Sequence, residues 1–333
     1  MYKKNKKFDI VIASRNRESS LKTLVGQIFN SSLLPDKVII VDSSNVAYDL
    51  SEYKTRVIHL RTSYKNQPIQ RYIGFKECSN EFIIFFDDDM RILNNNSIEA
   101  IISSFRDPHF VGVQPKIIHS NSFYQKKMPK SPFRDLAKRY VFFKILKLLS
   151  GNPNIQTGKF WYSGLRGSNP EFDEDVEWFN GPVFALRRST AYLNFNYKIF
   201  EIYSNNYGKG EDAILGLTTS KFGKIIFKDI PGLFHEDSQD SVYTKNFFVY
   251  AKRLAYSRLY MSYEYARIKN KPYLFAFIFF NLYIFGRLGT LFFNQLCKYD
   301  KKRNLIIKGI FIGFITAIRD RKSLKVFKHE ANI

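Results

Sequence analysis

The sequence predicts an α/β fold in which a mainly parallel sheet is flanked by helices. Short, nearly continuous apolar runs alternate with segments whose apolar residues recur at three- and four-residue spacing. Parallel neighbouring strands need crossover connections of this kind. Acidic residues directly follow two of the apolar runs. Because ligands of such sheets bind beyond the carboxyl ends of the strands, a candidate site is expected at that edge.

The elements of the first third follow from these patterns. FDIVIAS at 8–14 is apolar along nearly its whole length, as in a strand buried on both faces. A helix should follow, since apolar residues recur at helical spacing from Leu21 to Ile28, with Ser19 or Ser20 as the N-cap. Three further strands are expected at 37–41, 56–60 and 81–86, and a helix at 69–78.

The remainder is less regular. The segment from about 120 to 177 is irregular, with Gly, Pro and Asn frequent at 151–170 while aromatic residues persist, which indicates a loop-rich insertion. Beyond Tyr243 the composition shifts to helices dense in Tyr, Phe, Lys and Arg. No G-x-G-x-x-G follows the first strand, which argues against an ordinary dinucleotide-binding domain.

Composition indicates an anionic partner and a reducing compartment. The formal charge of the 333-residue chain is +22, from 52 Lys and Arg against 30 Asp and Glu. Nucleic acid, anionic lipid or a phosphorylated substrate would each suit that charge. The 33 Phe and 21 Tyr favour lipid. Cys78 and Cys297 have no metal or redox spacing, and the basic segment 1–7 leads into a strand, so the cytosol or the inner membrane surface is expected.

Three aspartates directly follow the strand at 81–86. Along an extended chain, side chains at i and i+2 point the same way, so Asp87 and Asp89 can address one cation while Asp88 faces elsewhere. Carboxylate oxygens suit Mg²⁺ or Mn²⁺, which usually bridge to substrate phosphates. The alternative is a solvated acidic turn before a helix that begins near Ser97. The position after a buried strand, in a chain short of acid, favours the metal site.

Several motifs resemble those of one enzyme family. Three segments resemble the nucleotide-binding half of family 2 glycosyltransferases of the GT-A fold: VIASRNR (11–17), KVIIVDSSN (37–45) and IIFFDDDMR (83–91). Three more resemble its acceptor-side segment, E-D motif and late histidine: WFNGPVFALRRS (178–189), GEDAILGL (210–217) and PGLFHED (231–237). Their shared order over roughly 8–240 makes a chance match improbable.

The resemblance implies how the donor would be bound. The donor is a nucleotide diphosphate sugar, whose nucleotide would contact Ser14, Asp42, Arg71 and Asp88. Asp42 would meet the base or ribose, and Asp88 would lie against the ribose. The alternatives are a strand-end cap for Asp42 and a surface salt bridge for Arg71.

The resemblance also implies a ligand set for Mn²⁺ or Mg²⁺. Asp89, helped by Asp87, would bind the ion, and His235 would be the third protein ligand. A single histidine is otherwise more often structural.

On the acceptor side, inversion at an anomeric carbon needs a base within reach of the acceptor hydroxyl. Asp212 is the candidate, and Glu211 would position the acceptor or share that role. Both could instead simply occupy the first turn of a helix, where negative charge is favoured. Trp178, Asn180 and Gly181 would form the acceptor floor, since aromatic faces pack on sugar rings and Gly permits close approach. Burial of Trp178 in the core is the rival interpretation.

The C-terminal part has the composition of a membrane-associating region. The run 273–286 is apolar except for Asn281 and is followed by Arg287, so it falls short of the about 20 residues of a spanning helix unless the next run is added. A shorter apolar run covers 309–318. Flanking Lys and Arg favour helices that lie in the lipid headgroup region. A buried helical subdomain and an oligomer interface are the alternatives.

The expected organisation is a catalytic domain at 1–242, with a donor half at 8–118 and an acceptor half at 119–242, and a helical region at 243–333. The expected enzyme is an inverting glycosyltransferase, cytoplasmic and peripheral on the inner face of the cell membrane, acting on a glycan or lipid-linked glycan. A polyprenyl-phosphate sugar synthase of the same fold, a nucleotidyltransferase and a non-catalytic scaffold are the alternatives. No nucleic acid partner is expected, because no such module is recognisable; a homo-oligomer is left open.

Overall fold

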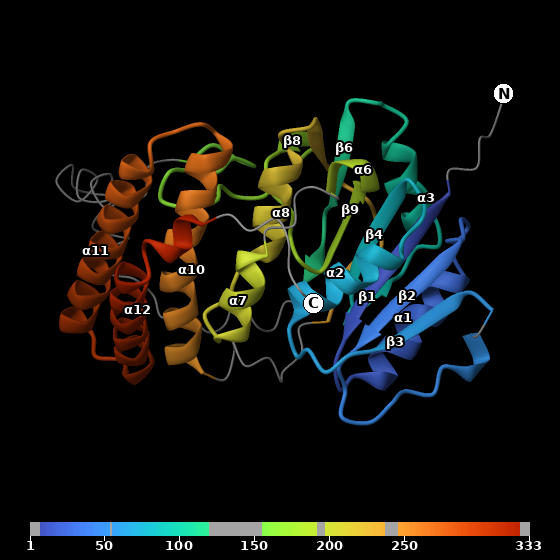
Figure 1. The fold of residues 1–333 in the computed structure, drawn as a ribbon, viewed down its shortest axis with the longest axis horizontal. Helices are drawn as coiled ribbons and strands as arrows, with labels where there is room; N and C mark the ends of the chain where they lie inside the picture. The colour runs from blue at the N-terminus through green and yellow to red at the C-terminus, as the bar shows by residue number, and fades with distance from the viewer. Residues whose placement is uncertain (1–6, 54, 120–154, 192–196, 237–245, 327–333) are drawn as a thin grey trace.

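The fold is built on one eight-stranded sheet (Figure 1). The computed structural model describes residues 7–53, 55–119, 155–191, 197–236 and 246–326. The sheet order is β3-β2-β1-β4-β9-β6-β10-β8. In chain order the strands are β1 (Phe8–Ser14), β2 (Lys37–Asp42), β3 (Val57–Arg61), β4 (Phe82–Asp87), β6 (Phe110–Pro115), β8 (Glu174–Val176), β9 (Val183–Arg187) and β10 (Lys224–Lys228).

The first four strands form a parallel block, as predicted. β1 pairs in parallel with β2 and β4, and β2 with β3. The register sets Ser14 beside Asp42 and Ala13 beside Asp87, so the polar residues that end three strands share one edge. β9 runs antiparallel between β4 and β6, which makes the sheet mixed and not wholly parallel.

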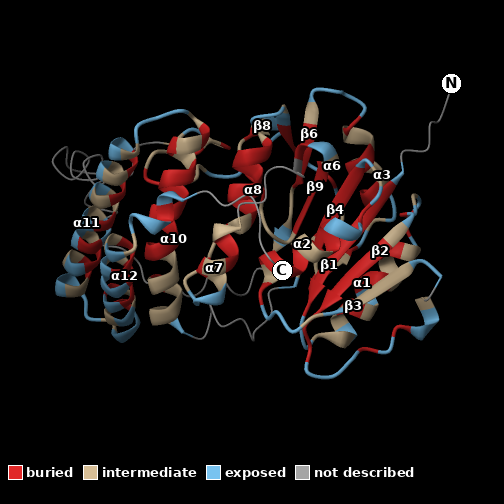
Figure 2. Cartoon of the chain, viewed as in Figure 1, coloured by how far each residue is buried: buried red, intermediate tan, exposed pale blue. Residues whose placement is uncertain are grey.

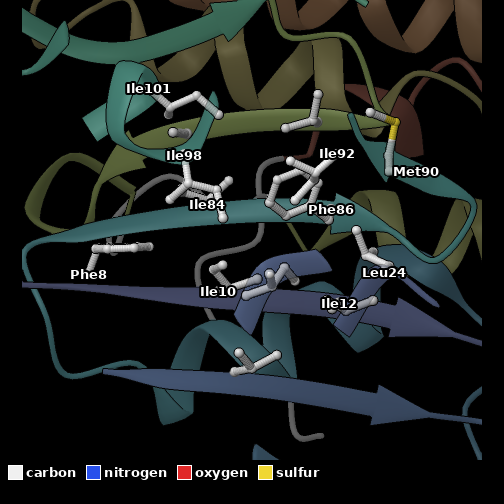
Figure 3. Close-up of a cluster of buried hydrophobic side chains, with 14 of the residues drawn as sticks. Phe8, Ile10, Ile12, Leu24, Ile84, Phe86, Met90, Ile92, Ile98 and Ile101 are labelled. Carbon is white, nitrogen blue, oxygen red and sulfur yellow. The ribbon is translucent and has the colours of Figure 1, made fainter. Parts of the chain in front are cut away.

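Helices bury both faces of this block. α1 (Glu18–Phe29) and α3 (Ser97–Ser104) pack on one face, where Ile10, Ile84 and Leu24 belong to one buried cluster (Figure 3). On the other face Val11 and Phe85 pack with Phe75 of α2 (Gln67–Glu77). Successive residues of β1 therefore enter opposite cores, which is why its sequence is apolar without alternation.

The predicted starts of two helices differ from the structure. The N-cap of α1 is Arg17, so Ser19 and Ser20 lie inside the helix and the predicted cap was wrong. The hydroxyl of Ser20 instead donates to the main-chain oxygen of Asp88 at 2.8 Å. α2 begins two residues earlier than predicted, because the side chain of Asn66 caps it.

A small sheet and three short helices complete the region before residue 246. β5 (Met90–Ile92), β11 (Leu233–His235) and β7 (Ile118–His119) form a three-stranded sheet in the order β5-β11-β7. The helices are α6 (Arg188–Ala191), α7 (Lys198–Ser204) and α8 (Glu211–Thr219), and two short 3₁₀ turns are η1 (Ser51–Tyr53) and η2 (Ser323–Lys325). Most of the predicted insertion, 120–154, lies outside the described residues.

Three long helices, α10 (Phe247–Ile268), α11 (Tyr273–Cys297) and α12 (Lys301–Arg319), lie side by side at one end of the molecule (Figure 1). They share a buried cluster with Ile69 of α2, Phe200 of α7 and Ile214 of α8. α11 continues through Arg287 without a break over 25 residues. Among the described helices, it is the one whose length and hydropathy would suffice to cross a membrane, a property that core helices also show.

Candidate active site

The acidic triplet lies where β4 ends, and two of its members face a histidine. Asp87 Oδ1 accepts hydrogen bonds from Arg71 Nη2 at 2.6 Å and Gln67 Nε2 at 2.7 Å. Asp89 Oδ1 lies 3.1 Å from His235 Nε2. One potential ligand atom from each of Asp87, Asp89 and His235 lies within 4.8 Å of the others. β11 delivers the histidine, because its register sets His235 opposite Met90 of β5.

Asp88 and Asp89 lie in the turn that follows β4, where the alternation of an extended strand no longer applies, and Asp88 has partners of its own besides one that it shares with Asp89. Asp88 Oδ2 accepts from Ser14 Oγ at 2.8 Å and its Oδ1 from Arg17 Nη1 at 2.9 Å. The same Arg17 nitrogen donates to Asp89 Oδ2 at 2.6 Å. Burial raises the pKa of Asp88 to about 6, because the charge of Arg17 only partly offsets the lost hydration and Asp89 adds repulsion.

This donor set fits a divalent cation. Burial raises the pKa of Asp87, and neighbouring Asp89 adds to the effect against the opposing charge of Arg71. Burial also acts to raise the pKa of Asp89, but His235 and Arg17 outweigh it and lower that pKa. Two partly buried carboxylates and an imidazole nitrogen are ligands that suit Mn²⁺ or Mg²⁺, and a cation among them would relieve the repulsion between the carboxylates.

Asp42 ends β2 at the same edge and is fully buried. It accepts hydrogen bonds from Arg61 Nη1 at 2.6 Å and from the main-chain nitrogen of Ser44 at 2.7 Å, and His59 Nε2 lies 3.3 Å away. Burial acts to raise its pKa, yet the bonds from Ser44, Arg61 and His59 outweigh that effect and lower the pKa. Asp42 is thus a fixed carboxylate near Ser14, and its contact with a nucleotide stays a prediction.

Arg71 joins the triplet to the second half of the molecule. Its guanidinium donates to Asp87, to Glu211 Oε1 at 3.0 Å and to the main-chain oxygen of Gly181 at 2.8 Å. The residue is 3% exposed, so the alternative of a surface salt bridge is wrong. Its Nε has no hydrogen-bond partner within the described residues, and the contact of Arg71 with a nucleotide stays a prediction.

Glu211 and Asp212 open α8 directly after Gly210, whose φ of 84° lies in the left-handed region that favours glycine. Burial raises the pKa of Glu211 to about 7, and adjacent Asp212 adds repulsion that Arg71 offsets in part. Glu211 Oε2 accepts from the hydroxyl of Tyr203, so both of its oxygens are engaged. A Cβ added to Gly181 would lie 3.4 Å from Asp212 Oδ2, so the glycine leaves room beside that carboxylate.

The residues predicted to bind the acceptor, Trp178, Asn180 and Gly181, are only partly accessible. Trp178 is 5% exposed, packs against Phe160 and Leu217, and has the guanidinium of Arg166 4.5 Å from its ring centroid. The main-chain nitrogen of Asn180 donates to a glutamine side chain. A sugar could stack on Trp178 only if Arg166 moved, so the acceptor role of Trp178, Asn180 and Gly181 stays a prediction.

Several site residues were not singled out from the sequence. Arg17 lies within the VIASRNR motif, and its bonds to two aspartates could have been anticipated from that position. No sequence pattern marks Gln67 or Tyr203 as part of the site, since their bonding to Asp87 and Glu211 depends on the tertiary fold. His119 of β7, with Nδ1 3.3 Å from His235 Nδ1, depends on the pairing of β7 with β11.

Comparison with known proteins identifies a family for the first half of the chain and a fold for the whole of it. Residues 9–167 match the model of glycosyl transferase family 2. The structure is similar to residues 1–349 of TarS from S. aureus, with 12% identity and a TM-score of 0.53 over 96% of this chain and 83% of that chain. It is also similar to the mannosyltransferase PcManGT from Pyrobaculum calidifontis in complex with GDP-Man and Mn²⁺, with 10% identity and a TM-score of 0.50 over 95% of this chain and 88% of that chain.

No curated protein matches this chain. At such low identities the two structural matches show the fold alone. The family match covers the segment that carries the acidic triplet. Residues 9–167 are therefore a glycosyltransferase domain of family 2, and the chain as a whole has the GT-A fold.

Proposed function

We propose that the enzyme transfers a sugar, with inversion, from a nucleotide diphosphate sugar to a hydroxyl of a glycan or glycolipid. The observation that carries this proposal is the single continuous site: Asp87, Asp89 and His235 gather around one point, and Arg71 links Asp87 to Glu211, the neighbour of Asp212. A site that performs inverting transfer needs both a place for the diphosphate and a base across the cleft from it.

On the donor side, Asp87, Asp89 and His235 hold Mn²⁺ or Mg²⁺ in this proposal. When bound, such an ion supplies charge neutralisation for the departing diphosphate. Ser14, Asp42 and Asp88 bind the nucleotide, for which their common sheet edge is suited. The mannosyltransferase determined with GDP-Man and Mn²⁺ lends support, because it has the same fold.

On the acceptor side, Asp212 takes the proton of the attacking hydroxyl. Asp212 is 9% exposed and lies beside Gly181, where the absent side chain leaves room for a hydroxyl. Glu211 is the weaker candidate for the base, because Arg71 and Tyr203 occupy its two oxygens. Glu211 and Arg71 therefore act as positioning residues that fix the start of α8 against the donor half.

A polyprenyl-phosphate sugar synthase is the second candidate, since it uses the same fold and donor and differs in the acceptor. The nucleotidyltransferase alternative does not agree with the family match.

A panel of nucleotide sugars tests the donor assignment. We expect one or two donors to raise the unfolding temperature in the presence of Mn²⁺ and to have little effect with a chelator, because binding to the folded state alone stabilises it. The corresponding free nucleoside diphosphates serve as positive controls and nucleosides as negative ones. Stabilisation by no nucleotide sugar, with or without metal, would contradict the proposed function.

The enzyme works at the inner face of the cell membrane, with α11 and α12 on the lipid. One face of α11 is buried against its neighbours through Ala276, Phe280 and Ile284. The opposite face is exposed and apolar, and it comprises Leu274, Phe275, Ile278, Leu282, Phe285, Phe292 and Leu296, here called the α11 stripe. Figure 2 shows this exposed side of α11 and α12 facing away from the sheet.

Charge on this surface favours anionic lipid over a second copy of the chain. From Lys271 to Val326 the sequence contains eleven Lys and Arg residues and two Asp. A contact between two copies of this face would bring like charges together, whereas acidic headgroups would complement them.

Packing favours a helix that lies along the membrane over one that spans it. α11 contacts α10 and α12. α10 contains Arg253, Glu264 and Arg267, and α12 contains Lys308 near its middle. A spanning α11 would have to pull these charges into the bilayer or abandon its partners, and both are costly.

Replacing two stripe residues tests this surface. Phe285→Glu with Leu282→Glu should weaken binding to phosphatidylglycerol-containing vesicles by at least about tenfold, because it removes apolar insertion and adds repulsion. Phe222→Glu is the matched control, an apolar residue that is 51% exposed far from the stripe, against 60% for Phe285. Binding of the wild type should fall with added salt; vesicle association that resists alkaline extraction would instead indicate a spanning helix.

A further inference from the structure

His235 of β11 has a second histidine beside it. In the three-stranded sheet β11 pairs in parallel with β7, and the register sets His235 opposite His119. Residues paired in this way project from the same face of a sheet. The two Nδ1 atoms lie 3.3 Å apart, and the ring planes are nearly perpendicular, at 87°, with the ring centroids 5.3 Å apart. The rings are therefore not stacked, and they meet through their nitrogen atoms.

The two ring nitrogens of His235 face different groups. Nε2 lies 3.1 Å from Asp89 Oδ1, on the side of the acidic triplet, and Nδ1 faces His119. The main-chain nitrogen of Glu236 donates to the main-chain oxygen of Asp89 at 3.0 Å, which ties the end of β11 to the triplet. Both histidines are partly buried, so water competes less for the bond between their rings than it would at the surface.

His119 lies outside the candidate ligand set. Across the residues that the structure describes, the group whose potential ligand atoms all lie within 4.8 Å of one another consists of Asp87, Asp89 and His235. His119 meets this group through Nδ1 of His235, the ring nitrogen that faces away from Asp89. The second histidine therefore stands behind a candidate ligand and not among the ligands.

This arrangement matters for the tautomer of His235. A hydrogen bond between two imidazole nitrogens needs one proton, which one of the two rings carries. A cation at His235 Nε2 would use the lone pair of that nitrogen, so the ring proton of His235 would lie on Nδ1. Histidines that bind metals almost always donate this remaining N–H to an acceptor, which orients the ring and fixes its tautomer. Nδ1 of His119 lies where that acceptor is needed.

An imidazole suits this position with and without a bound ion. A neutral histidine carries its proton on either nitrogen, so Nδ1 of His119 can accept from His235 or donate to it. A carboxylate could only accept, and a lysine could only donate. The bond between the two rings can therefore persist when an ion takes the place of the direct contact between His235 and Asp89.

We propose that His119 is a positioning residue for the metal site. Its Nδ1 accepts the Nδ1–H of His235 and so holds the Nε2 lone pair of His235 toward the ion. The inference rests on the proposed function, in which Asp87, Asp89 and His235 bind the metal, and it adds a residue outside that ligand set. Because His119 acts through His235, its replacement should weaken metal binding without removing a ligand.

Two replacements of His119 separate this role from packing. His119→Phe keeps a ring beside His235 but has no nitrogen, whereas His119→Asn is smaller and retains an acceptor near the position of Nδ1. We expect His119→Phe to weaken Mn²⁺ binding about ten- to a hundredfold and His119→Asn to weaken it less, as measured by the electron paramagnetic resonance of free Mn²⁺. If His119 only filled space between β7 and β11, the order would be reversed. The reversed order, or wild-type affinity in His119→Phe, would overturn the inference.

His109→Phe is the matched control for these variants. His109 is on the surface, where its Nδ1 lies 2.9 Å from a carboxylate oxygen of Asp107. This variant should bind Mn²⁺ as the wild type does, although it loses a histidine bond in the same way. The unfolding temperature of each metal-free variant shows whether the fold is intact, and that of His119→Phe should stay near the wild-type value because the ring contact is kept.

A double variant tests whether His119 acts through His235. His235→Phe removes a proposed ligand and should weaken Mn²⁺ binding more than His119→Phe does. Adding His119→Phe to it should change the affinity little, because residues in contact that act as one unit do not give additive effects. A further tenfold loss in the double variant would show that His119 acts on the ion in another way, contrary to the inference.

Pulsed electron paramagnetic resonance of bound Mn²⁺ distinguishes a positioning residue from a ligand. Coupling to the nitrogen of one imidazole should be present in the wild type and in His119→Phe, and absent from His235→Phe. Loss of a nitrogen coupling in His119→Phe would make His119 a ligand and overturn the inference. A wild type that binds no Mn²⁺ would refute the metal assignment of the proposed function, whereas equally tight binding by the wild type and His119→Phe would refute the inference alone.

Discussion

Asp212→Asn is expected to lower the rate of sugar transfer by at least about a hundredfold, because a general base contributes roughly 10²–10⁴ to such rates. Asparagine keeps the size and hydrogen-bonding shape of the side chain but cannot accept the proton. Donor binding should be unchanged, since the metal and nucleotide groups lie on the other side of Arg71. The measurements are initial rates of transfer and thermal stabilisation by the donor with Mn²⁺.

Two other carboxamide substitutions show whether the loss is specific. Glu211→Gln should reduce transfer less than Asp212→Asn, because Gln can still bond to Arg71 and Tyr203. Asp229→Asn, on the surface and paired with Lys116, should leave the rate unaltered. A rate for Asp212→Asn close to that of the wild type would show that Asp212 is not the general base. Glu211, with its pKa of about 7, would then be the next candidate.

The parallel half of the sheet could be read from the sequence because its signals are local. A strand buried on both faces must be apolar throughout, and β1, β2 and β4 each show this in consecutive residues. The aspartates that end β2 and β4 then had to share an edge, since parallel strands set their carboxyl ends together.

What the sequence did not predict depends on pairing between distant segments. Insertion of β9 between β4 and β6 brings Gly181 to Arg71, and nothing in either segment signals that neighbour. The burial of Arg71 is likewise a tertiary property, because a helix with many charges could have exposed it. For the same reason the sequence could not predict which face of α11 is exposed. Apolar residues occur on all sides of this helix, and packing against α10 and α12 decides which of them remain in solvent.

Asp89→Asn is expected to lower the affinity for Mn²⁺ by at least about a hundredfold, more than loss of an outer partner of a metal ligand would. Asn retains one oxygen but no charge, so the ion would lose a carboxylate, and only one of Arg17 and His235 would keep an oxygen acceptor. Both donor hydrolysis and transfer should then fall below detection. Metal binding is measured by the electron paramagnetic resonance of free Mn²⁺, which needs no substrate.

Asp107→Asn provides a matched control for that variant. Asp107 also pairs with a histidine, since its carboxylate lies 2.9 Å from His109 Nδ1, but the pair is on the surface. If any Asp–His pair sufficed to hold the ion, both variants would reduce the number of bound Mn²⁺; we expect the loss with Asp89→Asn alone. If Asp89→Asn still bound Mn²⁺ as the wild type does, the assignment of the acidic triplet as the metal site would be wrong. Metal lost equally in Asp212→Asn would instead show that the proposed base is a ligand, because only Asp87, Asp89 and His235 are assigned to the ion.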